Sequence, residues 1–387
     1  MDPLLSKTND ASSQIKDTLS KAASSVLDAY NNMNDDFASY IIYFIIVIII
    51  ICMIYFYSTT HNLQKNNCDA INNLYPSINS NITSIGKSFA NKFSDYYINS
   101  AYNACSGGNY KNGYVDICNL NAVIKAGVRC FDFAIYNEND TPVVATSIDD
   151  NFYVKETYNS IDFAEVMKTL YYNAFGDISP NKLDPIVVHL RIKSNNIKIY
   201  NTIAEIFKLY DDVMTSKITS YASYNTNFGN IPINKLLGKI IVIVDGSNNT
   251  YLQSESFFEY VNLVSNSNYM WLFKYSDIKN NPDIDDLTDN NKYNATIVLP
   301  DGGTDPDNPS AALAREYGCQ IVAMRYQKND NYLEENINYF NTNGYAFVLK
   351  PENLREQQVV ISPPVPQNPA YSYQTRQVNS NLYSFKY

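Results

Sequence analysis

The sequence has little histidine, little glycine and a shortage of positive charge. Its 387 residues include two histidines and 13 glycines, and 39 acidic residues outnumber 29 basic ones, which gives a net charge of −10. A nucleic-acid-binding protein needs a basic surface to displace counterions, so we expect no nucleic-acid partner. The same acidic balance provides no general attraction to an anionic membrane surface.

Cysteine usage and residue bias give two further expectations. The six cysteines are scattered and form no C-x-x-C pair, so we expect small buried residues and neither a zinc site nor a disulfide framework. Asparagine, isoleucine and tyrosine (34 residues) are abundant. This bias is typical of AT-rich coding, and it makes a large DNA virus a candidate source.

One long hydrophobic run is present. Residues 37–57 read FASYIIYFIIVIIIICMIYFY, with nine isoleucines and no charged residue. At about 1.5 Å per residue the run covers roughly 30 Å, the thickness of a bilayer core. A cleavable signal peptide is disfavoured because the run starts at residue 37 and lacks an A-x-A site. We predict a transmembrane helix over 37–57 and a single-pass protein of a virion or host internal membrane, with the lipid bilayer as a partner.

The segments on either side of this run are polar. Lysines flank it about equally, so its orientation is left open. Within residues 1–36, apolar side chains recur every three or four positions, at Ile15, Leu19, Ala22, Val26, Tyr30 and Met33. This spacing predicts an amphipathic helix that lies on a surface or binds a partner; a helix that continues into the hydrophobic run fits equally well. Residues 58–85 are rich in asparagine and serine, and we expect a linker there.

Strand-like apolar runs alternate with helical patterns over residues 86–358. Examples are RCFDFAI, PIVVHL and KIIVIVD. A helical stripe follows Ser160, the expected N-cap, and stops at Gly176; its members are Phe163, Val166, Met167, Leu170, Tyr171 and Ala174. Such alternation implies a parallel sheet covered by helices. We predict an α/β fold, a TIM-like (β/α) barrel, with its functional residues at the C-terminal ends of the strands.

Five motifs occur in a fixed order along this region. They are GVRCFDF, TPVVAT, AFGDISPNKLDPIVVHL, GCQIVAMRYQ and NGYAFVLKPENLR. In order and rough spacing, this region resembles the X and Y halves of phosphoinositide-specific phospholipase C. The resemblance implies a barrel of the phospholipase C-like phosphodiesterases, which cleave the phosphodiester of phosphoinositides through a cyclic intermediate.

The resemblance also implies two catalytic histidines, and both are replaced. Tyr102 stands where the first is expected, within SAYNA, and Thr146 stands where the second is expected, within PVVATS. Of the two histidines in the chain, His61 lies outside the predicted barrel and only His189 lies within it. No histidine pair is therefore available for general acid and base catalysis.

The implied metal and phosphate positions are only partly retained. Asn103 and Asp132 are kept, whereas Ala134 replaces an Asp or Arg and Arg191 replaces a glutamate. A cation at residue 191 would repel calcium, so we expect no cofactor, calcium included. Tyr326 matches the aromatic residue that stacks on the inositol headgroup.

Two readings of the remaining polar residues stay open. Asp132 is either a vestigial ligand or a carboxylate that pairs with Arg191 or Arg129. His189 and Arg191 alternate on one strand and so share one face.

The favoured hypothesis is a membrane-anchored, catalytically inactive domain that acts as a structural or binding module. The alternative is an active phosphoric diester hydrolase on a different phospholipid that uses Asp132, His189 and a relocated metal at a non-standard site.

The C-terminal segment, residues 359–387, is rich in proline and tyrosine. Its SPPVPQNP core favours an extended, polyproline-like chain. We expect either a docking segment for membrane or capsid proteins or a disordered tail.

Overall fold

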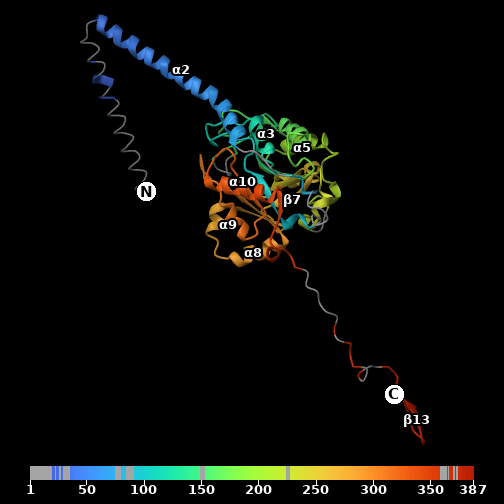
Figure 1. Ribbon diagram of the computed structural model, residues 1–387. Helices are drawn as coiled ribbons and strands as arrows, with labels where there is room; N and C mark the ends of the chain where they lie inside the picture. The colour runs from blue at the N-terminus through green and yellow to red at the C-terminus, as the bar shows by residue number, and fades with distance from the viewer. Residues whose placement is uncertain are drawn as a thin grey trace, which may run out of the picture.

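The computed structural model describes residues 20–21, 23–25, 28, 35–74, 80–83, 91–148, 153–223, 227–357, 364, 366–368, 371 and 374–387. A long helix, α2 (Asp35–Leu74), leads into a barrel. A small hairpin, β12 (Gln377–Asn379) and β13 (Ser384–Lys386), lies beyond the opposite end of the barrel (Figure 1). The predicted amphipathic segment 1–36 falls almost wholly outside the described residues.

Eight parallel strands form the barrel wall in the order β7-β6-β5-β2-β1-β10-β9-β8. They are β1 (Tyr96–Ala101), β2 (Cys130–Glu138), β5 (Ile186–Lys193), β6 (Ile240–Asp245), β7 (Val261–Ser265), β8 (Met270–Lys274), β9 (Ala295–Leu299) and β10 (Ile321–Met324). The two ends of this path, β7 and β8, follow each other directly in the chain, so the barrel is nearly closed. The predicted parallel α/β barrel is confirmed.

Within the described residues, three further strands belong to the same sheet but lie outside this wall. β3 (Thr141–Ala145) pairs antiparallel with β2, β4 (Ile161–Asp162) pairs with β3, and β11 (Phe347–Leu349) pairs antiparallel with β1. The sequence indicated β3 and β11 as strands but could not show that they run against the barrel direction. The sequence did not indicate β7, whose five residues, VNLVS, interrupt the apolar pattern with Asn262 and Ser265.

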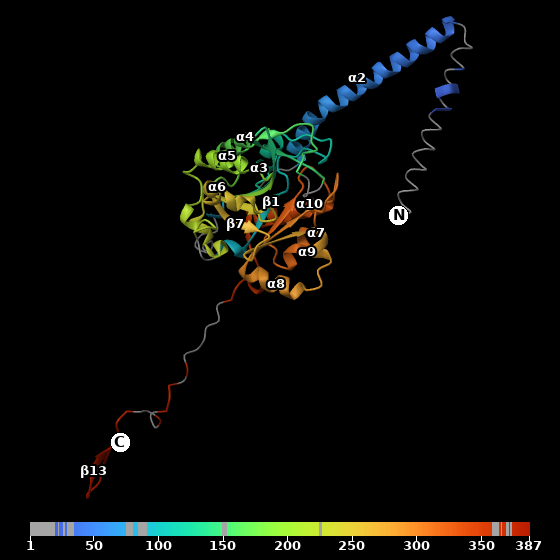
Figure 2. The same cartoon turned by 180° about the vertical axis from the view of Figure 1, so that it is seen from behind.

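Helices surround the barrel (Figure 2). They are α3 (Ile117–Lys125), α4 (Phe163–Thr169), α5 (Ile197–Lys208), α6 (Glu255–Phe258), α7 (Tyr275–Lys279), α8 (Ile284–Tyr293), α9 (Ala311–Glu316) and α10 (Asn331–Asn343). The expected N-cap of α4 was wrong. Asp162 accepts the capping bond from the Ala164 N–H at 2.9 Å, while the Ser160 hydroxyl donates to Glu138 at 2.8 Å. Of the predicted stripe, Phe163, Val166, Met167, Leu170 and Ala174 are buried and Tyr171 is half-buried.

Alternation along the strands divides the core into two layers. On β2, Phe131, Phe133 and Ile135 pack in the layer that faces the helices, whereas Cys130 packs in the barrel interior. Asp132 lies two residues from Cys130 and therefore shares the interior face. Strand β5 repeats the pattern, so His189 and Arg191 face inward as well.

Helix α2 extends well past the predicted transmembrane run. Its stretch Ser39–Asn72 has a mean hydropathy of 2.8 in its most apolar window, which makes it long and apolar enough to cross a membrane by length and composition. The predicted linker 58–85 therefore begins as helix. The cysteine expectation was wrong, because Cys68 of α2 forms a disulfide with Cys118 of α3.

A buried carboxyl group lies just before strand β5, and we expect it to make the stability of the fold depend on pH. Asp184 is fully buried and accepts the Ile82 N–H at 2.7 Å. Burial raises its pKa to about 7, although the Ile82 bond and the Arg129 charge oppose the rise. A raised pKa means that the folded state holds the proton more tightly. The stability from this group is therefore complete below pH ~4 and is lost as pH rises to about 7.

We therefore expect Asp184→Asn to raise the free energy of unfolding at pH 8 by about 2–4 kcal/mol and to leave it little changed at pH 4. Urea unfolding of the full chain in detergent at both pH values measures this. Asp177→Asn, at an exposed carboxylate, is the control. Equal gains at pH 4 and pH 8 would contradict the assignment.

Candidate functional site

A polar cluster fills the barrel interior where β2 and β5 lie side by side. Asp132 stands opposite His189, and Ala134 stands opposite Arg191. The Arg191 guanidinium donates to both Asp132 carboxylate oxygens, at 2.7 Å from Nη2 and 2.9 Å from Nε. His189 Nδ1 lies 2.7 Å from the same carboxylate, and its Nε2 lies 2.8 Å from the Ser265 hydroxyl. One carboxylate thus holds a cation and an imidazole.

The protonation state of Asp132 follows from these contacts. Burial alone would raise its pKa, but the Arg191 charge and the hydrogen bonds from His189 and Arg191 hold that pKa well below its usual range. The carboxylate stays ionised at neutral pH and is a poor proton acceptor. The sequence left open whether Asp132 pairs with Arg191 or with Arg129. Arg191 is the partner, because Arg129 donates instead to Asn181, Ser179 and the Ala174 carbonyl.

Tyr102 and Asn103 join this cluster from the end of β1. The Arg191 guanidinium carbon lies 4.5 Å from the Tyr102 ring centroid, within range of a cation–π interaction. The Asn103 side-chain carbonyl accepts from Arg191 at 2.7 Å, and its backbone N–H donates to Asp132 at 3.2 Å. Asn103 has a φ of 45°, a left-handed conformation that asparagine tolerates. The structure therefore brings four of the predicted site residues together.

The other three predicted residues contribute no chemistry to the cluster. Thr146 is buried, and its hydroxyl donates to the Tyr110 carbonyl at 3.0 Å. Ala134 presents only a methyl group, in contact with the β3 strand. Tyr326 packs in the layer between barrel and helices, where its hydroxyl donates to Asn99 at 2.8 Å. The predicted headgroup-stacking role of Tyr326 stays a prediction.

Several polar residues around the cluster were not predicted from the sequence. The Arg325 Nε donates to the Tyr110 hydroxyl at 2.8 Å, and its guanidinium lies 2.9 Å from the Asp305 carboxylate. The Lys274 ammonium lies 5.8 Å from the centroid of the Tyr102 ring. Ser265, Lys274 and Arg325 each end or directly follow a barrel strand. That position was the available signal, and recognising β7 would have found Ser265.

The residues present do not fit a calcium ion. Calcium binds six to eight oxygen ligands in proteins. The side-chain oxygens of Asn103 and Asp132 already accept hydrogen bonds from Arg191 and His189. The Arg191 charge also opposes a second cation. Over the described part of the chain, no three His, Cys, Asp or Glu side chains gather in a way that could hold a metal ion.

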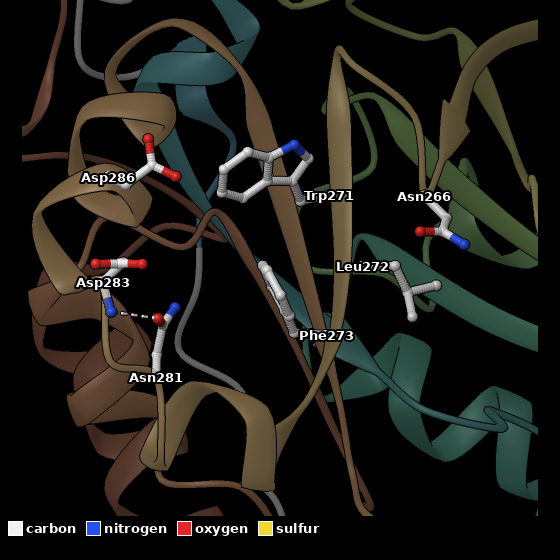
Figure 3. Close-up of a pocket in the computed structure, with 7 residues that line it drawn as sticks. All are labelled: Asn266, Trp271, Leu272, Phe273, Asn281, Asp283 and Asp286. Atoms are coloured by element: carbon white, nitrogen blue, oxygen red, sulfur yellow. Dashed lines mark hydrogen bonds between the residues drawn. The ribbon is translucent and has the colours of Figure 1, made fainter.

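A surface hollow of about 380 Å³ lies apart from this cluster, on the outer side of β8 (Figure 3). Trp271 and Phe273 point into it with ring centroids 5.8 Å apart, and Asp283 and Asp286 approach from the α8 side. Residues 266–269 connect β7 directly to β8, so no intervening helix covers this part of the strand. The hollow holds aromatic and acidic groups but none of the predicted site residues.

Comparison with known proteins agrees with this architecture. Residues 89–245 match the sequence model of the phosphatidylinositol-specific phospholipase C X domain. This part of the chain is phospholipase C-like. The match includes the positions of Tyr102, Asn103, Asp132 and Arg191. The predicted resemblance to the phospholipase C family is confirmed for this X-domain region. Among curated proteins, none matches the chain.

Two solved structures of PLC21 proteins share the fold at low sequence identity. PLC21 of S. officinalis matches with a TM-score of 0.57 and 18% identity over 70% of this chain and 38% of its own. PLC21 of L. pealei matches with the same TM-score and identity over 70% of this chain and 39% of its own. The chain therefore spans well under half the length of these relatives. A calcium-dependent phosphoinositol-specific phospholipase C from Pseudomonas sp has a TM-score of 0.45 at 12% identity, over 68% of this chain and 97% of its own.

Proposed function

We propose that this chain is a membrane-anchored, phospholipase C-like module that does not hydrolyse phosphoinositides and serves as a structural or binding component of a viral or internal membrane. The observation that carries the proposal is the buried Arg191–Asp132 pair. A guanidinium occupies the carboxylate that would otherwise bind a metal or activate a nucleophile.

The site lacks the general base and the general acid that cleavage of a phosphoinositide phosphodiester requires. Attack by the inositol hydroxyl needs a proton acceptor near Tyr102, whose phenol ordinarily titrates near pH 10. Departure of the leaving alkoxide needs a proton donor near Thr146, and a threonine hydroxyl is not acidic enough at neutral pH. Each such group contributes about 10²–10⁴ in rate, and losses within one unit do not simply add. Even with that discount, most of the rate acceleration is lost.

Access supports the same proposal. Asp132 and His189 are 0% exposed, Arg191 is 2% exposed and Tyr102 is 5% exposed. A headgroup could reach them only by displacing side chains that already hydrogen-bond to one another. Breaking a buried ion pair costs about 3–5 kcal/mol, and this cost would subtract from the free energy of substrate binding.

The anchoring part of the proposal rests on α2. Its isoleucine-rich stretch is exposed along its length, and a solvent-exposed face of that size is unfavourable in water. Insertion into a bilayer removes this surface from water. The proline- and tyrosine-rich tail, residues 359–387, offers a second contact, with membrane or capsid proteins as the proposed partners.

One observation favours a second function. Asp132, His189 and Ser265 are connected in the order of an Asp-His-Ser relay, an arrangement that activates serine nucleophiles in hydrolases. An active phosphoric diester hydrolase on a phospholipid would use this relay. All three side chains are 0% exposed, so the first proposal is favoured.

Hydrolysis of phosphatidylinositol by the full chain in mixed micelles, with and without calcium, distinguishes the two. We expect turnover no higher than that of a heat-denatured sample, and no change in Ser265→Ala or His189→Gln. Turnover above that background that disappears in both variants would establish the hydrolase. Turnover that both variants retain would point to a contaminating enzyme and would leave the purified chain inactive.

A further inference from the structure

The part of α2 beyond the hydrophobic run is fixed covalently to the barrel. Cys68 and Cys118 form a disulfide with their Cα atoms 5.8 Å apart. One helical turn earlier, the Gln64 side-chain amide donates to the Asp116 carboxylate. One turn later, the Asn72 amide lies 3.2 Å from the Cys118 sulfur. Three successive turns of α2 therefore contact the start of α3.

This contact lies at the C-terminal ends of the barrel strands. The loop after β1 leads into α3, and its glycines lie against α2. A Cβ added to Gly107 would lie 3.1 Å from the Cβ of Asn67, and one added to Gly108 would lie 3.0 Å from the Asn67 amide nitrogen. Ile71 is only 4% exposed. The helix and the loop are thus closely packed, and the disulfide joins surfaces that already fit.

A disulfide between two structural elements indicates an oxidising compartment. Such bonds persist in secreted, lumenal and surface domains, whereas cytosolic thiols are kept reduced. The other cysteines are Cys105, Cys130 and Cys319, which are buried, and Cys52, which is exposed within the apolar stretch of α2. The residues after the span are therefore expected on the oxidising side of the membrane.

A second feature points to the same side. The turn between β2 and β3 carries the sequence Asn139-Asp140-Thr141, an acceptor motif for N-glycosylation. Asn139 and Asp140 have φ values of 52° and 63°, as in a tight two-residue hairpin turn. Asn139 is exposed at its tip. A glycan there would project into solvent without disturbing the barrel.

The other three acceptor motifs are less accessible. Asn248 donates from Nδ2, the atom that would carry the sugar, to the carbonyls of Ile192 and Ser194. The Asn294 Nδ2 donates to Asn290 at 2.9 Å. The Asn81 side-chain oxygen accepts the Leu183 N–H at 2.8 Å. Exposure therefore singles out Asn139.

From these two features we infer that the barrel lies on the lumenal or exterior side of its membrane, held to the membrane helix by the Cys68–Cys118 disulfide and modified by an N-linked glycan on Asn139. The inference rests on the proposed anchoring by α2, and it adds an orientation and a modification site to that proposal.

Both modifications have defined chemistry. The two thiols form one S–S bond and pass two electrons and two protons to the disulfide of a lumenal oxidoreductase, which becomes a dithiol. In glycosylation, the Asn139 Nδ2 forms a bond to the anomeric carbon of a lipid-pyrophosphate-linked oligosaccharide. The carbon–oxygen bond to the pyrophosphate breaks, the lipid pyrophosphate departs, and the amide loses one proton.

The orientation is tested by expressing the full chain in eukaryotic cells and treating the membranes with peptide N-glycosidase. We expect a single mobility shift in the wild type that is lost in Asn139→Gln and Thr141→Ala but kept in Thr141→Ser, which preserves the acceptor motif. A chain that resists alkaline carbonate extraction but shows no shift would overturn the orientation and leave the anchoring intact. A chain that carbonate extracts would instead refute the anchoring.

The disulfide is tested on the same samples with a thiol-reactive polymer under denaturing conditions. Four of the six cysteines should react before reduction and all six after it. In Cys68→Ser the number should no longer depend on reduction, whereas Cys52→Ser should keep the difference. Reaction of all six cysteines without reduction would overturn the proposed link.

Discussion

Replacing Arg191 by methionine is expected to lower the free energy of unfolding by about 3–5 kcal/mol. Methionine keeps most of the side-chain volume but removes the charge. It leaves the Asp132 carboxylate buried, with the His189 ring and the Asn103 N–H still within hydrogen-bonding distance of it. An uncompensated buried charge is among the most destabilising changes known for point mutations. Urea unfolding of the full chain in detergent at pH 7 measures the loss.

A matched pair of variants makes this result specific. Lys208→Met removes an exposed cation from α5 and should change stability by less than about 0.5 kcal/mol. Adding Asp132→Asn to Arg191→Met removes the stranded charge and should recover at least half of the loss, because the two sites interact directly. If the double variant is as unstable as the sum of the single ones, the pair is not the element that stabilises the barrel interior.

Introducing aspartate at both Ile46 and Ile49 is expected to release the protein from membranes. Each charge in the middle of a span costs about 2.5–3.5 kcal/mol, so the pair opposes insertion by roughly 5–7 kcal/mol. The double variant should move to the alkaline carbonate supernatant, whereas the wild type and the conservative Ile46→Leu, Ile49→Leu variant stay in the pellet. Release of the wild type itself would contradict the anchoring.

The barrel could be predicted from the sequence because its signals are local and repeated. Apolar strands such as IVVHLRIK are buried along their whole length and so read as continuous runs. The inward polar cluster could be predicted in part for the same reason, since His189 and Arg191 must share a face. The pairing of Arg191 with Asp132 needed the strand register, which no local pattern contains.

What the sequence missed depends on distant contacts or on very short segments. Cys68 and Cys118 are 50 residues apart, and their pairing follows from where α2 ends against α3. Strand β7 reads VNLVS, in which Asn262 and Ser265 interrupt the apolar run, so it lacked the continuous pattern of the other barrel strands. Tyr326 was assigned by motif alone, and its packing in the layer that faces the helices lies past the end of β10, where strand alternation no longer predicts it. Ser160 lost the capping role because the chain is still extended at Ile161–Asp162.

The continuity of α2 has a mechanical consequence. Its 40 residues form a helix of about 60 Å. If α2 spans a bilayer as proposed, the bilayer core takes up about half of this length, and the remainder of the helix ends on the strand-end side of the barrel, with no loop between membrane and domain. Such a continuous helix is a rigid spacer. In the proposed anchored state it would set the height of the barrel above the lipid and confine the protein to diffusion in two dimensions. Encounters with a partner in the same membrane would then depend on lateral density, and a partner in a facing membrane would be reached only at a fixed gap.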